Sequence, residues 1–456
     1  MADRLLVLEV SAECFAHLPK CATALAAWCV LNAKWPVPLT LFAVGCLSLA
    51  VWLYLAVARG NFWRLHEFDD DTANHESPIA WPPVVAMIPA RNEATTIAQV
   101  LGSLLKQNYV GEFSVVLVDD HSEDATAQVA QQTAQDLNAE SRIKIYTAPA
   151  LPPGWTGKLW ALNSGTAIFG KRGTAISGCP PTTSISPGPP TTSRTASNSP
   201  GTPTSLPAYF WFTDADIVHA PDTLQRLVAR ADRDQLDLAS LMVLLQAKTF
   251  PERTLIPAFL FFFLKLYPPR WIADPKARTA GAAGGCILLR REALERIGGF
   301  AAIRNEVIDD CALARAIKRS GGRLWMGLTR ASVSLRAYTT FREIRDLIAR
   351  TAFTQLSYSP LLLLGTLLGM FLTYLAPVML LFVPHRAPQV LGASTWLLMS
   401  LLYLPTIRFY RLSPAWALIL PLTALFYSYA TFLSAARYHL GRGAQWKGRS
   451  QAHRSR

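Results

Sequence analysis

Long apolar stretches alternate with regions of mixed polar and hydrophobic residues along this chain. The first stretch runs from Leu39 to Ala58 without a charge, and its twenty residues suffice for a helix to cross the ~30 Å hydrocarbon core of a bilayer. The C-terminal third contains further runs of similar length, namely Pro360–Pro384, Gln389–Ile407 and Pro414–Ala436. We therefore predict an N-terminal membrane segment over residues 1–60, with its span at 39–58, and C-terminal membrane helices over residues 360–436.

Basic residues indicate on which side of the membrane the connecting segments lie. The loop Arg408–Arg411 and the basic tail over residues 437–456 favour the cytoplasm, where Lys and Arg accumulate. Three complete C-terminal spans would place this tail and the middle of the chain on opposite sides. Either one of the three runs is re-entrant or interfacial, or the tail is an exception. The sequence leaves these alternatives open.

The region between the membrane parts, residues 78–350, has the pattern of a soluble α/β domain. Apolar runs and helical periodicity alternate there: strands are predicted at 84–88, 115–118 and 143–146, and helices at 94–105 and 124–137. Strands separated by helices in this way predict a mostly parallel sheet. Ligands of such sheets bind at the carboxyl ends of the strands, which is where Asn92, Glu93, Asp119 and Asp120 lie.

Two segments depart from this pattern. Residues 173–207 are mostly Gly, Pro, Ser and Thr, and such a composition predicts a disordered insertion because it buries too little apolar area. Residues 255–271 contain a Phe cluster interrupted by Pro257, Lys265 and a Pro-Pro pair, which we expect to prevent a membrane span. The segment favours a helix at the lipid headgroup boundary, with a plain buried helix as the alternative.

Composition and charge narrow the possible functions. Hydrophobic residues make up 51% and charged residues 16%, which excludes a disordered chain. The net charge of +13 would suit nucleic acid, an anionic membrane or an anionic substrate. No nucleic-acid-binding motif is present, and the basic residues gather at the membrane flanks, so we predict no nucleic-acid partner. The seven cysteines lack zinc-binding spacing and indicate reduced thiols.

Three pairs of carboxylates could carry chemistry. Asp214 and Asp216 follow the aromatic strand predicted at 209–212, so both could reach one Mg²⁺ or Mn²⁺ ion, with a diphosphate supplying further oxygens. Asp119 and Asp120 end an earlier strand. Asp309 and Asp310 precede a helix predicted at 312–320, where acidic residues also occur simply because the helix dipole favours them.

The order of these motifs resembles that of the family 2 glycosyltransferases. The matching segments are Pro89-Ala90-Arg91-Asn92-Glu93, Val118-Asp119-Asp120-His121-Ser122-Glu123-Asp124-Ala125-Thr126, Asp214-Ala215-Asp216, the glycine-containing loops Gly281–Gly285 and Gly298–Phe300, and Asp309-Asp310. Together they cover roughly residues 84–330. The resemblance implies a GT-A fold in an enzyme that inverts the anomeric centre of a nucleotide-sugar donor.

The resemblance also implies a role for each candidate residue. Asn92 and Glu93 would organise the nucleotide pocket, Asp119 and Asp120 would contact uracil and ribose, and Lys158 would add positive charge near the diphosphate. A metal ion would bind Asp216 with help from Asp214. The general base would be Asp310, with Asp309 as the alternative. Asp310 is preferred because Leu313, Ala316 and Ile317 continue its face of the helix.

A finer resemblance is to the bacterial hopene-associated glycosyltransferases. It is carried by Gly154–Asn163, Asp309–Ala314, Ala349–Leu356 and Trp446–Arg449. It implies a lipid acceptor, with a hopanoid as one possibility, and a multi-pass protein of the inner membrane whose catalytic domain faces the cytoplasm. The insertion at 173–207 departs from the family, and the QxxRW motif of processive members is absent. Two alternatives remain, a catalytically impaired scaffold or transport component and a processive polysaccharide synthase.

Overall fold

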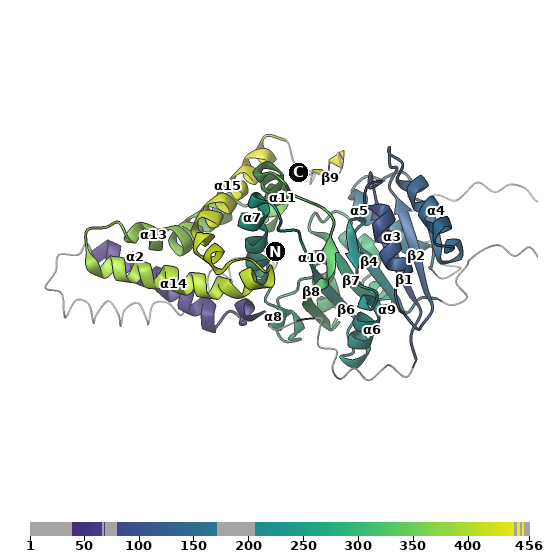
Figure 1. Cartoon of the computed structure of the whole chain (residues 1–456), viewed down its shortest axis with the longest axis horizontal. Helices are drawn as coiled ribbons and strands as arrows, with labels where there is room; N and C mark the ends of the chain where they lie inside the picture. Colours follow the sequence, from purple (N-terminus) through teal and green to yellow (C-terminus); the bar gives the residue numbers. More distant parts are fainter. Residues whose placement is uncertain are drawn as a thin grey trace, which may run out of the picture.

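A computed structural model describes residues 39–65, 68, 80–170 and 206–441, together with the backbone of 445–446 and 449–450. The predicted insertion therefore lies almost wholly outside the described residues, as do residues 1–38 and most of the tail. Figure 1 shows a sheet with flanking helices and, beside it, a group of long helices that extend away from the sheet. The predicted α/β class is confirmed.

The sheet has eight strands in the order β3-β2-β1-β4-β7-β6-β8-β5. Their bounds are β1 (Val84–Ala90), β2 (Phe113–Asp119), β3 (Ile143–Thr147), β4 (Tyr209–Thr213), β5 (Ile217–His219), β6 (Leu238–Leu244), β7 (Cys286–Arg290) and β8 (Leu324–Ser334). Strands β3, β2, β1 and β4 are parallel, as are β6 and β8, whereas β7 and β5 run antiparallel to their neighbours. The chain extends the sheet first from β1 toward β3 and then from β4 in the other direction. The strand order therefore reverses between β1 and β4, where a ligand crevice is expected.

Helices cover both faces of the sheet. Around it lie α3 (Ile97–Leu105), α4 (Thr126–Asp136), η3 (Glu140–Arg142), α5 (Gly157–Ala167), α6 (Thr223–Arg233), α9 (Arg291–Arg296), η4 (Gly299–Ile303) and α10 (Asp309–Arg319). Strand β1 is buried throughout because its alternate side chains enter two cores: Ala86 and Ile88 pack with α3, whereas Val85 and Met87 pack with α5. This double burial fixes the register of the strand that leads into Asn92 and Glu93.

The remaining elements form the helical part. They are α2 (Leu39–Val57), η2 (Phe62–Arg64), α7 (Phe250–Leu266), α8 (Pro269–Ala273), α11 (Phe341–Gln355), α12 (Pro360–Met370), η5 (Phe371–Leu375), α13 (Ala376–Leu380), α14 (Arg386–Phe409), η6 (Pro414–Ile419) and α15 (Leu420–His439), followed by β9 (Gln445–Trp446) and β10 (Arg449–Ser450). Five helical segments in the described part are long and apolar enough to cross a membrane: Leu39–Val57, Phe250–Ala273, Pro360–Leu380, Arg386–Phe409 and Pro414–His439. Four of them coincide with the apolar runs of the sequence.

The fifth, Phe250–Ala273, corrects the expectation that its prolines and lysine interrupt it too strongly. Helix α7 is continuous through Pro257, and Lys265 donates a hydrogen bond to the Tyr374 hydroxyl group at 2.9 Å. More than half of this segment is buried inside the protein. Its flanking strands β6 and β7 are antiparallel neighbours in the sheet, so the chain leaves the sheet and returns to it at the same edge. Length and composition would allow a span, but this connectivity favours a helix that stays beside the sheet.

Helix α2 is joined to the C-terminal helices by side-chain hydrogen bonds. The Ser48 hydroxyl donates to the carbonyl of Leu372, and the Trp52 indole donates to the carbonyl of Thr373 at 2.8 Å. Both acceptors lie in η5, a short π-helical turn in which the usual α-helical bonding is shifted. The N-terminal helix therefore bonds specifically to this turn.

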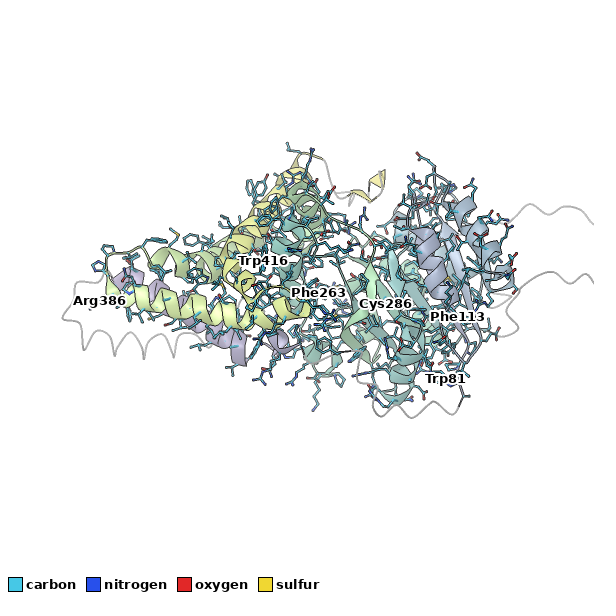
Figure 2. The ribbon with its side chains drawn as sticks, in the orientation of Figure 1. Trp81, Phe113, Phe263, Cys286, Arg386 and Trp416 are labelled. Carbon is cyan, nitrogen blue, oxygen red and sulfur yellow. The ribbon has the colours of Figure 1, made fainter. Side chains whose placement is uncertain are left out.

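The last two long helical segments differ in how far they extend from the sheet. Helix α14 begins at Arg386, which lies at the end of the helical part farthest from the sheet (Figure 2), and it returns to the sheet, where Arg330 of β8 donates to the Phe409 carbonyl at 3.0 Å. Segment η6–α15 starts from that side, and the Leu418 carbonyl accepts a bond from Trp396 in the middle of α14. The other end of this segment lies against α11, because Arg437 pairs with Asp346 at 2.7 Å.

Glu252 fixes the start of α7, and its removal should destabilise the fold. The buried carboxylate accepts backbone N–H bonds from Lys248, Thr249 and Tyr338 at 2.7–2.9 Å, so Glu252→Ala removes the acceptor of three partly buried donors at once. We expect a loss of about 3 kcal/mol, measured by thermal unfolding in detergent. Glu343→Ala removes the corresponding exposed carboxylate of the capping box that starts α11, and should cost about 1 kcal/mol or less. Equal losses in the two variants would contradict this account.

Candidate active site

The crevice between β1 and β4 collects several of the predicted residues. Glu93 follows β1, and Asp214 and Asp216 follow β4. The end of β8 closes this edge, because the Leu335 N–H donates to the Asp216 carbonyl at 2.7 Å and the Ser334 hydroxyl lies 3.5 Å from the Asp216 carboxylate. The Thr96 hydroxyl of the first loop donates to the Ala215 carbonyl at 2.9 Å. Two separate segments, the end of β8 and the loop after β1, thus hold the Asp-Ala-Asp turn.

Lys158 joins the two halves of the site. Its ammonium group, near the start of α5, lies 2.8 Å from an Asp214 carboxylate oxygen and 3.5 Å from one of Asp309. Burial alone would lower the pKa of Lys158, but the charges of Asp214, Asp309 and Asp310 raise it above its ordinary value. Lys158 therefore stays charged and bridges the Asp-Ala-Asp turn to the acidic start of α10. A cavity of about 20 Å³, room for a single water molecule, lies among these side chains.

Asp216 has no comparable ion pair within the cluster. The pKa of its carboxyl is raised to about 6, mainly by burial and then by the charges of Asp214 and Glu93, while the charges of Arg336 and Lys158 oppose the rise. In the described residues, no three His, Cys, Asp or Glu side chains converge on one point that could hold a metal ion by themselves. The Asp214–Asp216 pair still fits Mg²⁺ or Mn²⁺, because Mg²⁺ often takes one or two protein carboxylates and completes its shell with substrate phosphates and water.

Asp309 and Asp310 occupy the first turn of α10 but face different partners. Asp309 lies toward Lys158, whereas Asp310 accepts backbone N–H bonds from Gly284 at 2.9 Å and from Cys311 at 2.7 Å. The pKa of Asp310 is raised to about 6, mainly by burial and then by the charge of Asp309, while the charge of Lys158 and the two N–H bonds oppose the rise. A carboxylate with this pKa is largely ionised at neutral pH and accepts a proton more readily than an ordinary one.

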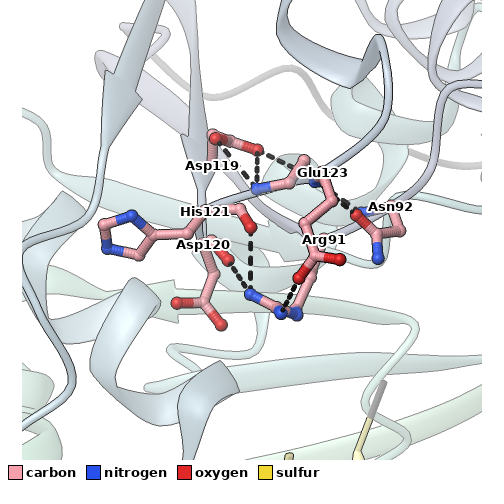
Figure 3. A network of polar contacts seen from close by, with 7 residues as sticks. Arg91, Asn92, Asp119, Asp120, His121 and Glu123 are labelled. Atoms are coloured by element: carbon pink, nitrogen blue, oxygen red, sulfur yellow. Dashed lines mark hydrogen bonds and ion pairs between the residues drawn. The ribbon is translucent and has the colours of Figure 1, made fainter. Parts of the chain in front are cut away.

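A polar network orders the loops after β1 and β2 (Figure 3). The buried Arg91 guanidinium donates to the carbonyls of Asp120, at 2.6 Å, and His121, and pairs with the Glu123 carboxylate at 3.1 Å. Asn92 also connects the two loops, because its side-chain oxygen accepts a hydrogen bond from the Glu123 N–H at 2.8 Å. The structure thus places Asn92 in the framework of the loop that follows β2.

Asp119 and Asp120 lie in this loop at the edge of the crevice. The Asp119 carboxylate accepts bonds from the Ser122 hydroxyl and N–H, which close a turn around it. Asp120 is fully buried, and its N–H donates to the Ala90 carbonyl at 2.8 Å. Both residues shape the wall beside β1, and a role in contacting uracil and ribose stays a prediction.

Sequence reasoning assigned no role to Arg91 or Gly284. Arg91 stands inside the Pro-Ala-Arg-Asn-Glu motif, so its position could have suggested a role, but its carbonyl partners come from a loop about thirty residues away. Gly284 belongs to the glycine-containing loop. A Cβ atom there would lie 3.2 Å from the Asp310 carboxylate and 3.5 Å from the Lys158 ammonium nitrogen, which explains why a side chain is disfavoured at this position.

Comparison with known families agrees with this geometry. Residues 82–354, more than half of the chain, match the family described as glycosyltransferase like family 2. The chain belongs to the family 2 glycosyltransferases. The matched region contains the whole sheet, the residues of the site and most of α11. No curated protein sequence matches the chain.

Solved glycosyltransferase structures show a distant likeness to this family 2 member. The mannosyltransferase PcManGT from Pyrobaculum calidifontis, in complex with GDP-Man and Mn²⁺, is 18% identical with a TM-score of 0.49, covering 88% of this chain and 99% of its own. For S. aureus TarS the identity is 14% and the TM-score is 0.35, and the match covers 72% of this chain and 44% of TarS. For glucosyl-3-phosphoglycerate synthase from Mycobacterium tuberculosis the corresponding values are 14%, 0.35, 60% and 79%. The family assignment rests on the match over residues 82–354.

Lys158→Met should destabilise the protein more at pH 8 than at pH 5. At pH 8 the variant leaves the carboxylates of Asp214, Asp309 and Asp310 without their cation. At pH 5 Asp310, with a pKa of about 6, takes up a proton and the repulsion falls. We expect a loss of about 3 kcal/mol at pH 8, the lower end for a broken buried pair, measured as the shift in melting temperature. Lys144→Met, at an exposed position of β3, is the control. A shift independent of pH would contradict the bridging role.

Proposed function

We propose that this family 2 glycosyltransferase is an inverting, metal-dependent enzyme of the membrane that transfers a sugar from a nucleotide-sugar donor to a lipid acceptor. The observation that carries the proposal is the Lys158 bridge, which brings the Asp-Ala-Asp turn and the acidic start of α10 to one point. A donor bound at the turn would present its sugar toward Asp310. The residues shared with the hopene-associated members make a hopanoid the preferred acceptor.

Asp216 and Asp214 would hold the metal ion with the donor diphosphate. Bound there, the ion would neutralise the phosphate charge and make the nucleoside diphosphate a better leaving group. Asp214 is the more open residue, with its side chain 37% exposed, and it already contacts Lys158. Glu93 and Arg336 lie close enough for their charges to act on Asp216. Lys158 would contribute a fixed positive charge beside the diphosphate.

Asp310 would act on the acceptor. Its carboxylate takes the proton of the acceptor hydroxyl group while the hydroxyl oxygen bonds to the anomeric carbon and the bond to the diphosphate breaks. The Gly284 N–H holds one carboxylate oxygen at 2.9 Å and the Cys311 N–H holds the other at 2.7 Å, so that the two bonds together fix the orientation of the carboxylate. Lys158 keeps Asp309 paired, which separates the roles of the two neighbouring acids.

The helices support an inner-membrane topology with the catalytic domain in the cytoplasm, where nucleotide sugars are made. Helices α2, α12–α13 and α14 would cross the membrane. Segment η6–α15 would be re-entrant, because both of its ends lie on the side of the sheet. Its start follows the contact of Phe409 with Arg330 of β8, and its end pairs with Asp346 of α11. The tail after Arg437 would then lie on the same side as the catalytic domain. This arrangement resolves the conflict between three apolar runs and a cytoplasmic basic tail.

Metal dependence can be measured by transfer of radiolabelled sugar in vesicles that contain extracted bacterial lipids. We expect EDTA to abolish transfer and Mg²⁺ or Mn²⁺ to restore it. Asp216→Ala should lower the rate by about 10²–10³-fold, the order seen when an electrostatic stabiliser is lost. Asp232→Ala, in the exposed last turn of α6, should leave the rate unchanged. Full activity in EDTA would exclude the metal role.

Asp310→Asn should keep donor binding and lower the transfer rate by about 10²–10⁴-fold. Because the base must be ionised and its pKa is about 6, the wild-type rate should fall as the pH drops through 6. Asp309→Asn should slow transfer much less. The opposite result would make Asp309 the base, and unchanged rates in both variants would exclude base catalysis by this pair.

Topology can be tested with single cysteines and a membrane-impermeant maleimide on sealed vesicles, each compared with the parent chain. Leu440→Cys, just after α15, and Lys276→Cys, after α8, should label from the cytoplasmic side. Arg386→Cys, at the start of α14, should label from the opposite side. Labelling of positions 440 and 386 from one side would show that η6–α15 crosses the membrane.

A further inference from the structure

A large apolar groove lies among the helices beside the catalytic domain. Its volume is about 690 Å³, and the starts of α7 and α11, segment η6 and one face of α15 line it. The main wall residues are Phe250, Phe341, Trp416, Leu422, Phe426 and Tyr429. The groove is separate from the small polar cavity around Lys158.

Hydrogen bonds and ring contacts hold the groove open. The Thr423 hydroxyl of α15 donates to the Thr254 carbonyl at 3.2 Å, and the Tyr427 hydroxyl donates to the Leu255 carbonyl at 3.0 Å. These bonds fix α15 against α7. The ring of Phe250 lies 5.7 Å from that of Trp416 and 6.1 Å from that of Phe341, within the range of favourable aromatic pairs. The walls are therefore formed without a ligand.

The wall residues expose much apolar surface. Phe250 is 65% exposed and Leu422 is 63% exposed, although both belong to otherwise well-packed helices. A contiguous exposed apolar surface marks a site for a membrane or another apolar ligand. Aromatic side chains are also enriched at the membrane interface, the depth at which the proposed topology places the starts of α7 and α11.

Two chain segments connect the groove to the active site. Leu335, which bonds to Asp216, is followed six residues later by the wall residue Phe341. Gln246 donates to the carbonyls of Ser334 and Leu335 at 3.1 and 2.8 Å, and is followed four residues later by the wall residue Phe250. Even fully extended, six residues span only about 20 Å. One rim of the groove therefore lies within about that distance of the Asp-Ala-Asp turn.

We propose that this groove binds the hydrocarbon body of the lipid acceptor, so that the acceptor's polar end extends past Phe250 and Phe341 toward Asp310. This proposal rests on the proposed function. An acceptor lipid fits better than a protein helix, because the wall offers aromatic and aliphatic surface with few polar groups and opens among helices proposed to contact the membrane. The rim next to the catalytic edge distinguishes the groove from the lipid-facing surfaces of α2 and α14.

The test uses the full-length protein in lipid nanodiscs and a photoreactive probe, a hopanoid alcohol with a diazirine in its hydrocarbon part. Leu422→Trp should narrow the groove without a packing conflict, because Leu422 is 63% exposed. The matched control is Leu397→Trp, at a 59% exposed leucine of α14 outside the groove. Mass spectrometry locates the labelled peptides, and nucleotide-sugar binding is measured in parallel.

Labelling should fall on the peptides that contain Phe250, Phe341 or Leu422–Tyr429. Leu422→Trp should reduce it by about tenfold, the order that a change in a hydrophobic pocket produces, whereas Leu397→Trp should have no effect. Nucleotide-sugar binding should be equal in all three proteins. Equal labelling of α2 and α14, or labelling insensitive to Leu422→Trp, would show bulk lipid contact and overturn the proposal. If groove labelling is specific but no sugar is transferred to any lipid, the proposed function fails and the binding site stands.

Discussion

A single buried cation connects the parts of the site that lie far apart in sequence. Lys158 comes from α5, Asp214 from the turn after β4 and Asp309 from the start of α10, and the ammonium group lies within 3.5 Å of both carboxylates. Without it, three acids would share a partly dehydrated space, which is energetically costly. The positions of the Asp-Ala-Asp turn and of the start of α10 are therefore mutually dependent. The same contacts leave little space beside Gly284, where a Cβ atom would lie 3.2 Å from the Asp310 carboxylate and 3.5 Å from the Lys158 ammonium nitrogen.

The same edge of the sheet also organises the helical part. The chain leaves it twice, after β6 into α7 and after β8 into α11, and each helix begins with a Thr and Glu capping box. Tyr338 connects the two starts because its N–H donates to Glu252. The candidate site and the apolar helices are thus fixed to one another over short distances.

Local patterns predicted the first half of the sheet well. Val84, Val115 and Ile143 lie in strands because short apolar runs there are bounded by polar turns, and the helices between them show clear periodicity. The antiparallel direction of β7 was not foreseen, since a strand's own pattern carries no direction. Pro257, Lys265 and the Pro-Pro pair were expected to prevent a membrane span, yet α7 is continuous through Pro257 and the segment is long and apolar enough to cross a membrane. The sequence indicates that Lys158 and Arg91 are charged residues near a site. It does not indicate their partners, because those contacts depend on long-range packing.

The bonds from Ser48 and Trp52 to η5 give the first helix a role beyond anchoring. In a lipid environment a shifted turn exposes carbonyl groups that water cannot reach, and side chains of another helix must satisfy them. Helix α2 is made early in synthesis, whereas its acceptors at Leu372 and Thr373 emerge more than three hundred residues later. An unrelated hydrophobic anchor of equal length would hold the chain in the membrane but leave this turn unsatisfied. The N-terminal helix is thus part of the folded core, and assembly of the membrane part is completed only after the catalytic domain has been synthesised.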